Sequence, residues 1–452
     1  EDLAMLQYAD EVLSPLLRRV IDEELKRGDT TTPYSHLVSG VFRIWGAEDF
    51  TAILSALGKD KLVRSSYYVM YGNADDRTQS LCRLLTVCVP KPTDTADDLR
   101  KLVKQRKISE KRLIEAALYC PEWVELVEEV IGLPGFRSAA YYFMAHMNED
   151  FDDIRKARIA RFTPLSIDEL KNGAFDITWF RSAFTEVGEK YFNLIYDAAT
   201  YITSGAKHSR ARKYADAVLG RMQLDATKEE IIAKRNKDLL MAYALIPLSG
   251  EEDLQARYLY IQQFLKESRT YGAQRAASEK MASEIALTNL ALNAGYADSM
   301  RLTLRMETRL VEENHELFEP HVIDDLKVRI TVDEQGVADV LCEKAGKALK
   351  SIPAKYKKNE YILRLNDMKK QLVEQQRRAK RMLEEAMEAC TIFTAGEIAA
   401  LMSNPVIAPI LSKLVFEHDD AFGFVSSLTL VDAAGAATAL NDTDELVVAH
   451  PF

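Results

Sequence analysis

The sequence repeats the marks of an amphipathic helix from its start to about residue 312. Apolar side chains recur at steps of three and four residues and so share one helix face, as at Leu13, Leu17 and Val20. Glycine (19 residues) and proline (13 residues) both fall below their usual shares of about 7% and about 5%, which leaves little material for sheets and turns. The Ser/Thr-x-x-Asp/Glu pattern that caps helix N-termini begins at Thr95, Ser166, Thr227 and Ser249. We therefore predict a mainly α fold, either an irregular bundle or a HEAT-like stack of helical hairpins.

The pattern changes near residue 326. Residues 326–332 alternate apolar and polar side chains, the turn residues DEQG follow at 333–336, and residues 337–342 return as a second strand, which predicts a hairpin. One long helix is expected from about 357 to 389. Its apolar seam favours a spine packed within the protein, and it comprises Leu365, Met368, Leu372, Gln375, Ala379, Met382 and Ala386.

These patterns predict three parts: an N-terminal helical segment (1–105), a helical-repeat-like domain (106–312) and a smaller mixed α/β domain (313–452) that contains the long helix. Strand-like residues at 422–425 and 446–448 close the sequence, which stops directly after an apolar strand. We therefore expect the last domain to be truncated at its C-terminus.

Composition and charge exclude several classes. The formal net charge of −10 gives no global attraction to nucleic acid or to an anionic membrane. The longest apolar stretch, residues 239–248, is about half of the ~20 residues that a membrane span needs, and the acidic first residues are unlike a signal peptide. The five cysteines are scattered and form no Cys-x-x-Cys pair, so we expect reduced thiols in a cytoplasmic protein.

The standard catalytic motifs are absent from the sequence. Phosphate-loop, dinucleotide, zinc-protease and nucleophile-elbow patterns do not occur, and Gly346-Lys347 lacks the upstream glycine of a phosphate loop. Glu312-x-x-His315 has the spacing of a di-iron ligand pair, but a di-iron site needs a second such pair and further glutamates. We accordingly predict no catalytic residue, metal site or cofactor in these residues, and lean against an enzyme.

Charge is segregated in one segment. Thirteen basic residues and three acidic ones lie between residues 344 and 381, and the candidate interaction residues on the long helix are Lys369, Lys370, Arg377, Arg378, Lys380 and Arg381. Such cations can face water or the acidic part of the same chain, bind a protein partner, or bind phosphates. Few aromatic residues accompany them, so we expect nucleic-acid binding to be weak and non-specific.

Several blocks resemble the MolR-like (molybdate metabolism regulator-like) bacterial proteins, a family of unknown function in which some members carry a WGR domain. The blocks, in the family's order, are ISEKRL (108–113), AALYCPEW (116–123), GLPGF (132–136), YYFMAH (141–146), NGAFDITWF (172–180), AGYADSMRLT (294–303), GKALKSIP (346–353), QRRAKRMLEEAM (376–387) and VVAHP (447–451). The sequence departs from the family at Tyr141, Tyr142, Met147 and Leu304. The resemblance implies a continuation beyond residue 452 and, because relatives occur beside MoxR-type AAA+ ATPases, a protein partner of that kind.

Two functions follow as hypotheses. The first is a non-catalytic, cytoplasmic scaffold or regulatory protein, an adaptor for an AAA+ ATPase system. The alternative is an enzyme of unknown reaction whose active site is completed by residues beyond 452, with a candidate pocket formed by His146, Trp179, Arg301 and His450. Convergence of these four side chains would favour the alternative.

Overall fold

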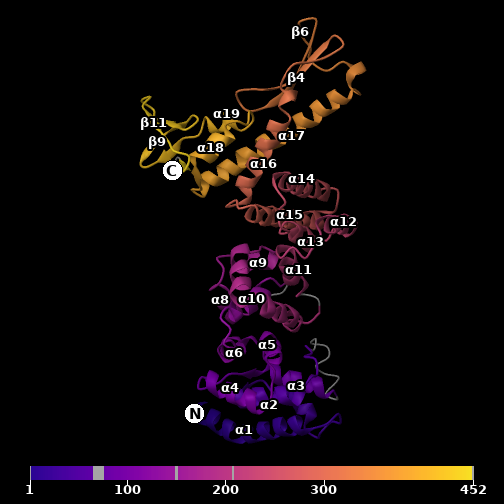
Figure 1. The fold of residues 1–452 in the computed structure, drawn as a ribbon, viewed down its shortest axis with the longest axis vertical. Helices are drawn as coiled ribbons and strands as arrows, with labels where there is room; N and C mark the ends of the chain where they lie inside the picture. Colours follow the sequence, from indigo (N-terminus) through magenta and orange to yellow (C-terminus); the bar gives the residue numbers. More distant parts are fainter. Residues whose placement is uncertain (1, 65–75, 148–150, 206–207, 450–452) are drawn as a thin grey trace. The chain divides into compact units, whose positions relative to one another are not determined.

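The computed structural model describes residues 2–64, 76–147, 151–205 and 208–449. The chain divides into two compact units, residues 1–294 and 295–452 (Figure 1). The first unit is almost wholly helical, and the second combines helices with two antiparallel sheets. The prediction of a mainly α fold with a smaller mixed α/β C-terminal region and one long helix is confirmed.

The first unit consists of short to medium helices in succession, most of them joined by brief turns. Their bounds are α1 Asp2–Lys26, α2 Ala47–Leu57, α3 Arg77–Thr86, α4 Ala96–Gln105, α5 Glu110–Tyr119, α6 Val124–Ile131, α7 Phe136–Ala145, α8 Asp153–Ile159, α9 Ile167–Asn172, α10 Ile177–Ala198, α11 Ser209–Val218, α12 Leu224–Lys234, α13 Lys237–Tyr243, α14 Glu251–Ser268 and α15 Ala273–Asn293. Two brief strands, β1 Ile44–Trp45 and β2 Cys88–Val89, pair in parallel and interrupt the helical pattern that the sequence predicted. Two residues per strand are too few to show the alternation of apolar and polar side chains that predicts a strand.

The predicted helix caps divide into two groups. Thr95 and Ser166 cap α4 and α9 as expected, and Ser166 forms a complete capping box with Glu169. The predictions at Thr227 and Ser249 were wrong. Thr227 lies inside α12, where its hydroxyl donates to the Gln223 carbonyl at 2.7 Å. Ser249 precedes the cap residue of α14, and its backbone N–H and hydroxyl donate to Asp253 instead.

The second unit is built on α16 (Ser299–Glu313) and the long helix α17 (Glu360–Glu388). Its first sheet has the order β3-β4-β5-β6, with β3 His321–Ile323, β4 Leu326–Val332, β5 Ala338–Lys344 and β6 Lys347–Ala348. The predicted hairpin is β4–β5, with Val332 opposite Ala338 next to the turn. Gly336 in that turn has a φ of 77°, and a Cβ there would lie 2.6 Å from the Val406 carbonyl oxygen, so only glycine fits.

The second sheet closes the described chain. It has the order β11-β10-β9-β8-β12-β7, with β7 Ile392–Thr394, β8 Phe416–His418, β9 Ala421–Val425, β10 Thr429–Val431, β11 Ala437–Ala439 and β12 Glu445–Val448. The short helices α18 (Ala395–Leu401) and α19 (Ala408–Leu411) lie between β7 and β8 in sequence. Thr394 caps α18 with a complete capping box that includes Glu397.

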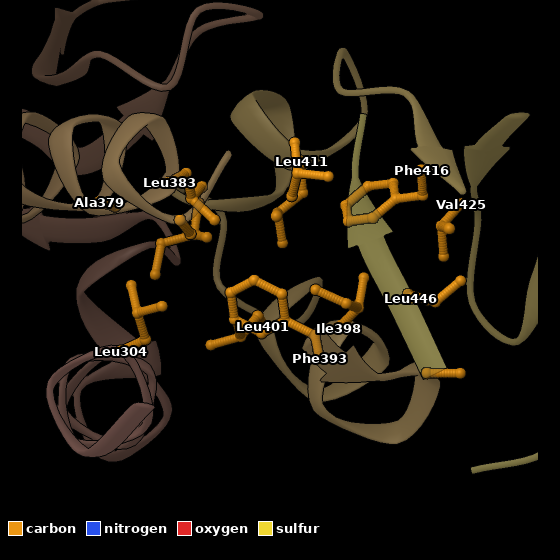
Figure 2. Packing of buried hydrophobic residues seen from close by; sticks show 14 of the residues in the cluster. Leu304, Ala379, Leu383, Phe393, Ile398, Leu401, Leu411, Phe416, Val425 and Leu446 are labelled. Carbon is orange, nitrogen blue, oxygen red and sulfur yellow. The ribbon is translucent and has the colours of Figure 1, made fainter. Parts of the chain in front are cut away.

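Helix α17 serves two hydrophobic cores. Its first half packs Leu365 and Leu372 against the β4–β5 hairpin and Val406. Its second half packs Ala379 and Leu383 into a core with α16, α18 and the second sheet, which Figure 2 shows around Phe393. The buried residues of the helix are Ile362, Leu365, Met368, Leu372, Gln375, Ala379, Leu383 and Ala386. The predicted spine is therefore observed, except that Leu383 occupies the seam position assigned to the half-buried Met382.

Candidate functional site

Two residues of the predicted pocket, His146 and Trp179, lie in the aromatic core of the first unit. Their ring centroids are 5.8 Å apart, and the His146 imidazole also contacts the rings of Tyr142, Phe175 and Tyr214. The His146 side chain is fully buried. Its Nδ1 lies 2.9 Å from the Tyr142 carbonyl oxygen, which closes the end of α7.

Burial determines the charge of His146. Removal of the imidazole from water lowers its pKa from 6.5 to about 4, although the hydrogen bond to Tyr142 opposes this. The ring is therefore neutral near pH 7. The Trp179 indole N–H donates to the Ser138 hydroxyl at 2.9 Å, so its one donor is used within the fold. The two side chains thus act as core residues that stabilise the packing of α7 against α10.

Arg301 belongs to the second unit and is held by its own neighbours. It lies at the start of α16, forms ion pairs with Asp298 and Glu397, and donates to the Ile392 carbonyl. Its guanidinium carbon lies 5.1 Å from the centre of the Phe393 ring. His450 lies outside the described residues. Because the structure describes His146 and Trp179 in one unit and Arg301 in the other, the convergence of the four side chains stays a prediction.

The candidate interaction residues of α17 have carboxylate neighbours. Arg378 pairs with the buried Glu307 at 2.6 Å, and Lys369 pairs with Asp339 at 2.5 Å. Lys370, Lys380 and Arg381 each have a carboxylate of α17 itself within 4.0 Å. Arg377 is exposed and has no carboxylate partner among the described residues. Their role toward a partner stays a prediction.

Metal-ligating residues do not gather in the described chain: no group of three or more His, Cys, Asp or Glu side chains there could hold an ion. The His315 Nδ1 lies 3.0 Å from the backbone carbonyl oxygen of Glu312. His418 lies 3.7 Å from Asp419 and 3.9 Å from Asp444 across a strand end. None of the helices that the structure describes has the length and apolar character to cross a bilayer.

A basic groove, which the sequence did not reveal, lies in the first unit between the α12–α13 junction and the start of α15. Its volume is about 480 Å³, and it is open to solvent. The lining combines four cations with one carboxylate and two neutral polar side chains: Lys234, Arg235, Lys237, Arg275, Glu279, Gln274 and Ser278. The local signal was the run Lys234-Arg235-Asn236-Lys237, but Arg275 joins it only through tertiary packing.

The floor of the basic groove is a buried ion-pair network. Glu279, 2% exposed, accepts hydrogen bonds from Arg235 at 2.8 Å and from Arg275 at 2.8 Å. Burial alone would raise the pKa of Glu279, but the two guanidinium groups outweigh it and hold the pKa below its ordinary value. Arg235 also pairs with Glu267 and donates to the Phe264 carbonyl. The floor is therefore ionised and fixed at neutral pH.

The walls of the basic groove are more exposed. Lys237 donates to the Ser278 hydroxyl and has no carboxylate partner among the described residues. Lys234 pairs with Glu230 at 2.8 Å, with both side chains largely in water. Arg275 lies 4.0 Å from the centre of the Tyr271 ring. These groups can attract and hydrogen-bond an anion, because exposed ion pairs hold their partners weakly.

The fold and the groove together define a mainly α protein whose charged groups support packing and which presents a cationic groove on the first unit. The chain belongs to a family of unknown function, DUF5724, whose model matches residues 1–306. A domain of unknown function, DUF4132, matches residues 346–452. Searches of curated proteins and of solved structures gave no match.

Proposed function

We propose that this protein is a non-catalytic, cytoplasmic scaffold or regulatory protein that acts by binding another protein. The observation that carries this proposal is that the candidate pocket side chains His146 and Arg301 are both engaged in contacts within the fold. His146 is neutral and enclosed by aromatic rings, and Arg301 is engaged by two carboxylates and a backbone carbonyl. Both side chains stabilise packing, so binding is the better-supported role.

The cysteines support the cytoplasmic part of the proposal. All five are free thiols, and Cys82, Cys88, Cys120 and Cys342 are buried. Burial raises the pKa of the Cys82 and Cys120 thiols, which keeps them protonated and unreactive. Buried, unpaired thiols are typical of proteins that fold in a reducing compartment.

The proposed partner is a MoxR-type AAA+ ATPase, as the resemblance to MolR-like proteins implies. The test uses the two purified proteins, this chain in its full natural length and the MoxR-type ATPase of the same host, analysed by size-exclusion chromatography with and without ATP. A stoichiometric complex, together with a changed rate of ATP hydrolysis, supports the proposal. Separate elution under both conditions, or turnover of a substrate by this protein alone, would refute it.

A further inference from the structure

We propose that the basic groove binds an acidic segment of a partner protein, with carboxylates of that segment on Lys237 and Arg275. This inference rests on the proposed binding function and assigns it a surface. The groove lies wholly within the first unit, between the α12–α13 junction and the first two turns of α15.

Lys237 and Arg275, in the walls of the groove, have hydrogen-bond donors that could bind an anion. Lys237 is exposed, and its ammonium group, a donor of three hydrogen bonds, is held by the neutral Ser278 hydroxyl alone among the described residues. Arg275 uses its Nε for Glu279, and its two terminal nitrogens donate to no other described residue. A carboxylate placed between these side chains would form charge-assisted hydrogen bonds with both.

The groove is also prepared for such a ligand before it binds. Glu279 and Glu267 fix the Arg235 guanidinium in the floor, 4.0 Å from the centre of the Phe264 ring. Arg275 is oriented by its hydrogen bond to Glu279 and by the Tyr271 ring. Because these side chains are already ordered, a ligand would meet a smaller entropic cost than at a surface of free lysines.

The surroundings favour carboxylates of a protein over a nucleic acid. Glu230 and Glu267 lie beside the cations, so the local field suits a few charges and repels a continuous phosphate backbone. The exposed aromatic side chain beside these cations, Tyr271, already contacts the guanidinium groups of Arg235 and Arg275 at 5.0 and 4.0 Å. Its ring is therefore poorly placed to stack a base, which single-strand binders need.

The experiment measures fluorescence anisotropy of a labelled peptide that alternates glutamate with glycine, titrated with the whole protein at about 50 mM and about 200 mM salt. A peptide with glutamine in place of glutamate, a single-stranded oligonucleotide of similar length and inorganic phosphate serve as competitors. The test variant is K237Q/R275Q. The matched control is K104Q/K111Q, which removes two exposed lysines of α4 and α5 that form no ion pair among the described residues. Circular dichroism and thermal unfolding establish that both variants are folded.

We expect micromolar binding of the acidic peptide that weakens with salt, falls at least about tenfold in K237Q/R275Q and is unchanged in K104Q/K111Q. Equal loss in both variants, equal binding of the glutamine peptide, no binding at all, or stronger competition by oligonucleotide or phosphate would each overturn the inference. The proposed function is judged separately: if K237Q/R275Q still forms the complex with the ATPase, the scaffold role stands and the groove assignment fails.

Discussion

Replacing Gln375 with methionine should raise the free energy of unfolding of the second unit. Gln375 lies at the midpoint of α17, between the core that contains Leu372 and the core that contains Ala379. Its side chain is 1% exposed, and its Oε1 accepts no hydrogen bond from the described residues. A buried amide oxygen of this kind gives up its hydration without a hydrogen-bond donor from the described part of the protein in exchange.

The magnitude follows from what the substitution removes. An unsatisfied buried polar group costs about 1–3 kcal/mol. Methionine has the same unbranched length as glutamine and flexible torsions. Strain from repacking should therefore offset less than about 1.5 kcal/mol of that gain. With a mid-range gain of about 2 kcal/mol and strain of about 0–1 kcal/mol, a net stabilisation of about 1–2 kcal/mol is expected, which is a change of about fivefold to about thirtyfold in the population of the unfolded unit.

Hydrogen exchange of backbone amides in Glu360–Glu388 is the appropriate measurement, because Trp45, Trp123 and Trp179 all lie in the first unit and do not report on α17. Exchange in Gln375→Met should slow by the factor given above. The matched control is Gln371→Met, at an exposed position of the same helix, which should change stability by less than about 0.5 kcal/mol. Faster exchange in Gln375→Met, or equal slowing in both variants, would refute the reasoning.

Three further outcomes are expected. Phe393→Ala should destabilise the second unit by about 3–5 kcal/mol, because the ring is 1% exposed within the core of Figure 2, and unchanged exchange in α17 would contradict this. Ser166→Ala should cost the first unit about 1 kcal/mol in urea unfolding, because it removes the hydroxyl that accepts from the Glu169 N–H, whereas Asp168→Ala, with no part in the capping box, should cost less. The folded-state pKa of His146 is about 4 against 6.5 for the free side chain, so the unfolded chain binds the proton first as the pH falls. The stability from neutral His146 is complete above about pH 6.5 and should fall by about 3 kcal/mol towards pH 4. Urea unfolding followed by tryptophan fluorescence should show that loss in the parent protein and not in H146F, and identical pH slopes in the two would refute it.

The long-range periodicity of the sequence predicted most of the architecture, because a buried face at three- and four-residue steps recurs over many turns. The spine helix, the β4–β5 hairpin and the caps at Thr95 and Ser166 all follow from such local rules. The predicted caps at Thr227 and Ser249 failed because a hydroxyl can also donate to a backbone carbonyl of the preceding turn or to a carboxylate four residues on.

The basic groove could not be predicted because its residues come from two segments about forty positions apart in the sequence. Lys234 and Lys237 flank the α12–α13 junction, and Arg275 and Ser278 lie on α15. The sequence directed attention instead to α17, where charge is dense along one helix, but there, among the described residues, every cation except Arg377 has a carboxylate one turn away or on a neighbouring element. Charge density along a sequence measures how many cations a segment has, and only packing determines how many of them remain available.

Arg235 illustrates how the groove is tied to the backbone beneath it. It ends α12 with a φ of 46°, in the left-handed region that glycine or asparagine occupies at many helix ends. That conformation costs a residue with a Cβ about 1 kcal/mol, and the cost is offset here by two carboxylates and the Phe264 carbonyl that hold the guanidinium. The same left-handed turn sets the direction in which α13 begins, and so it places Lys237 opposite Ser278. The left-handed backbone of Arg235 therefore connects the turn between α12 and α13 with the buried ion-pair network and with the exposed cations of the basic groove.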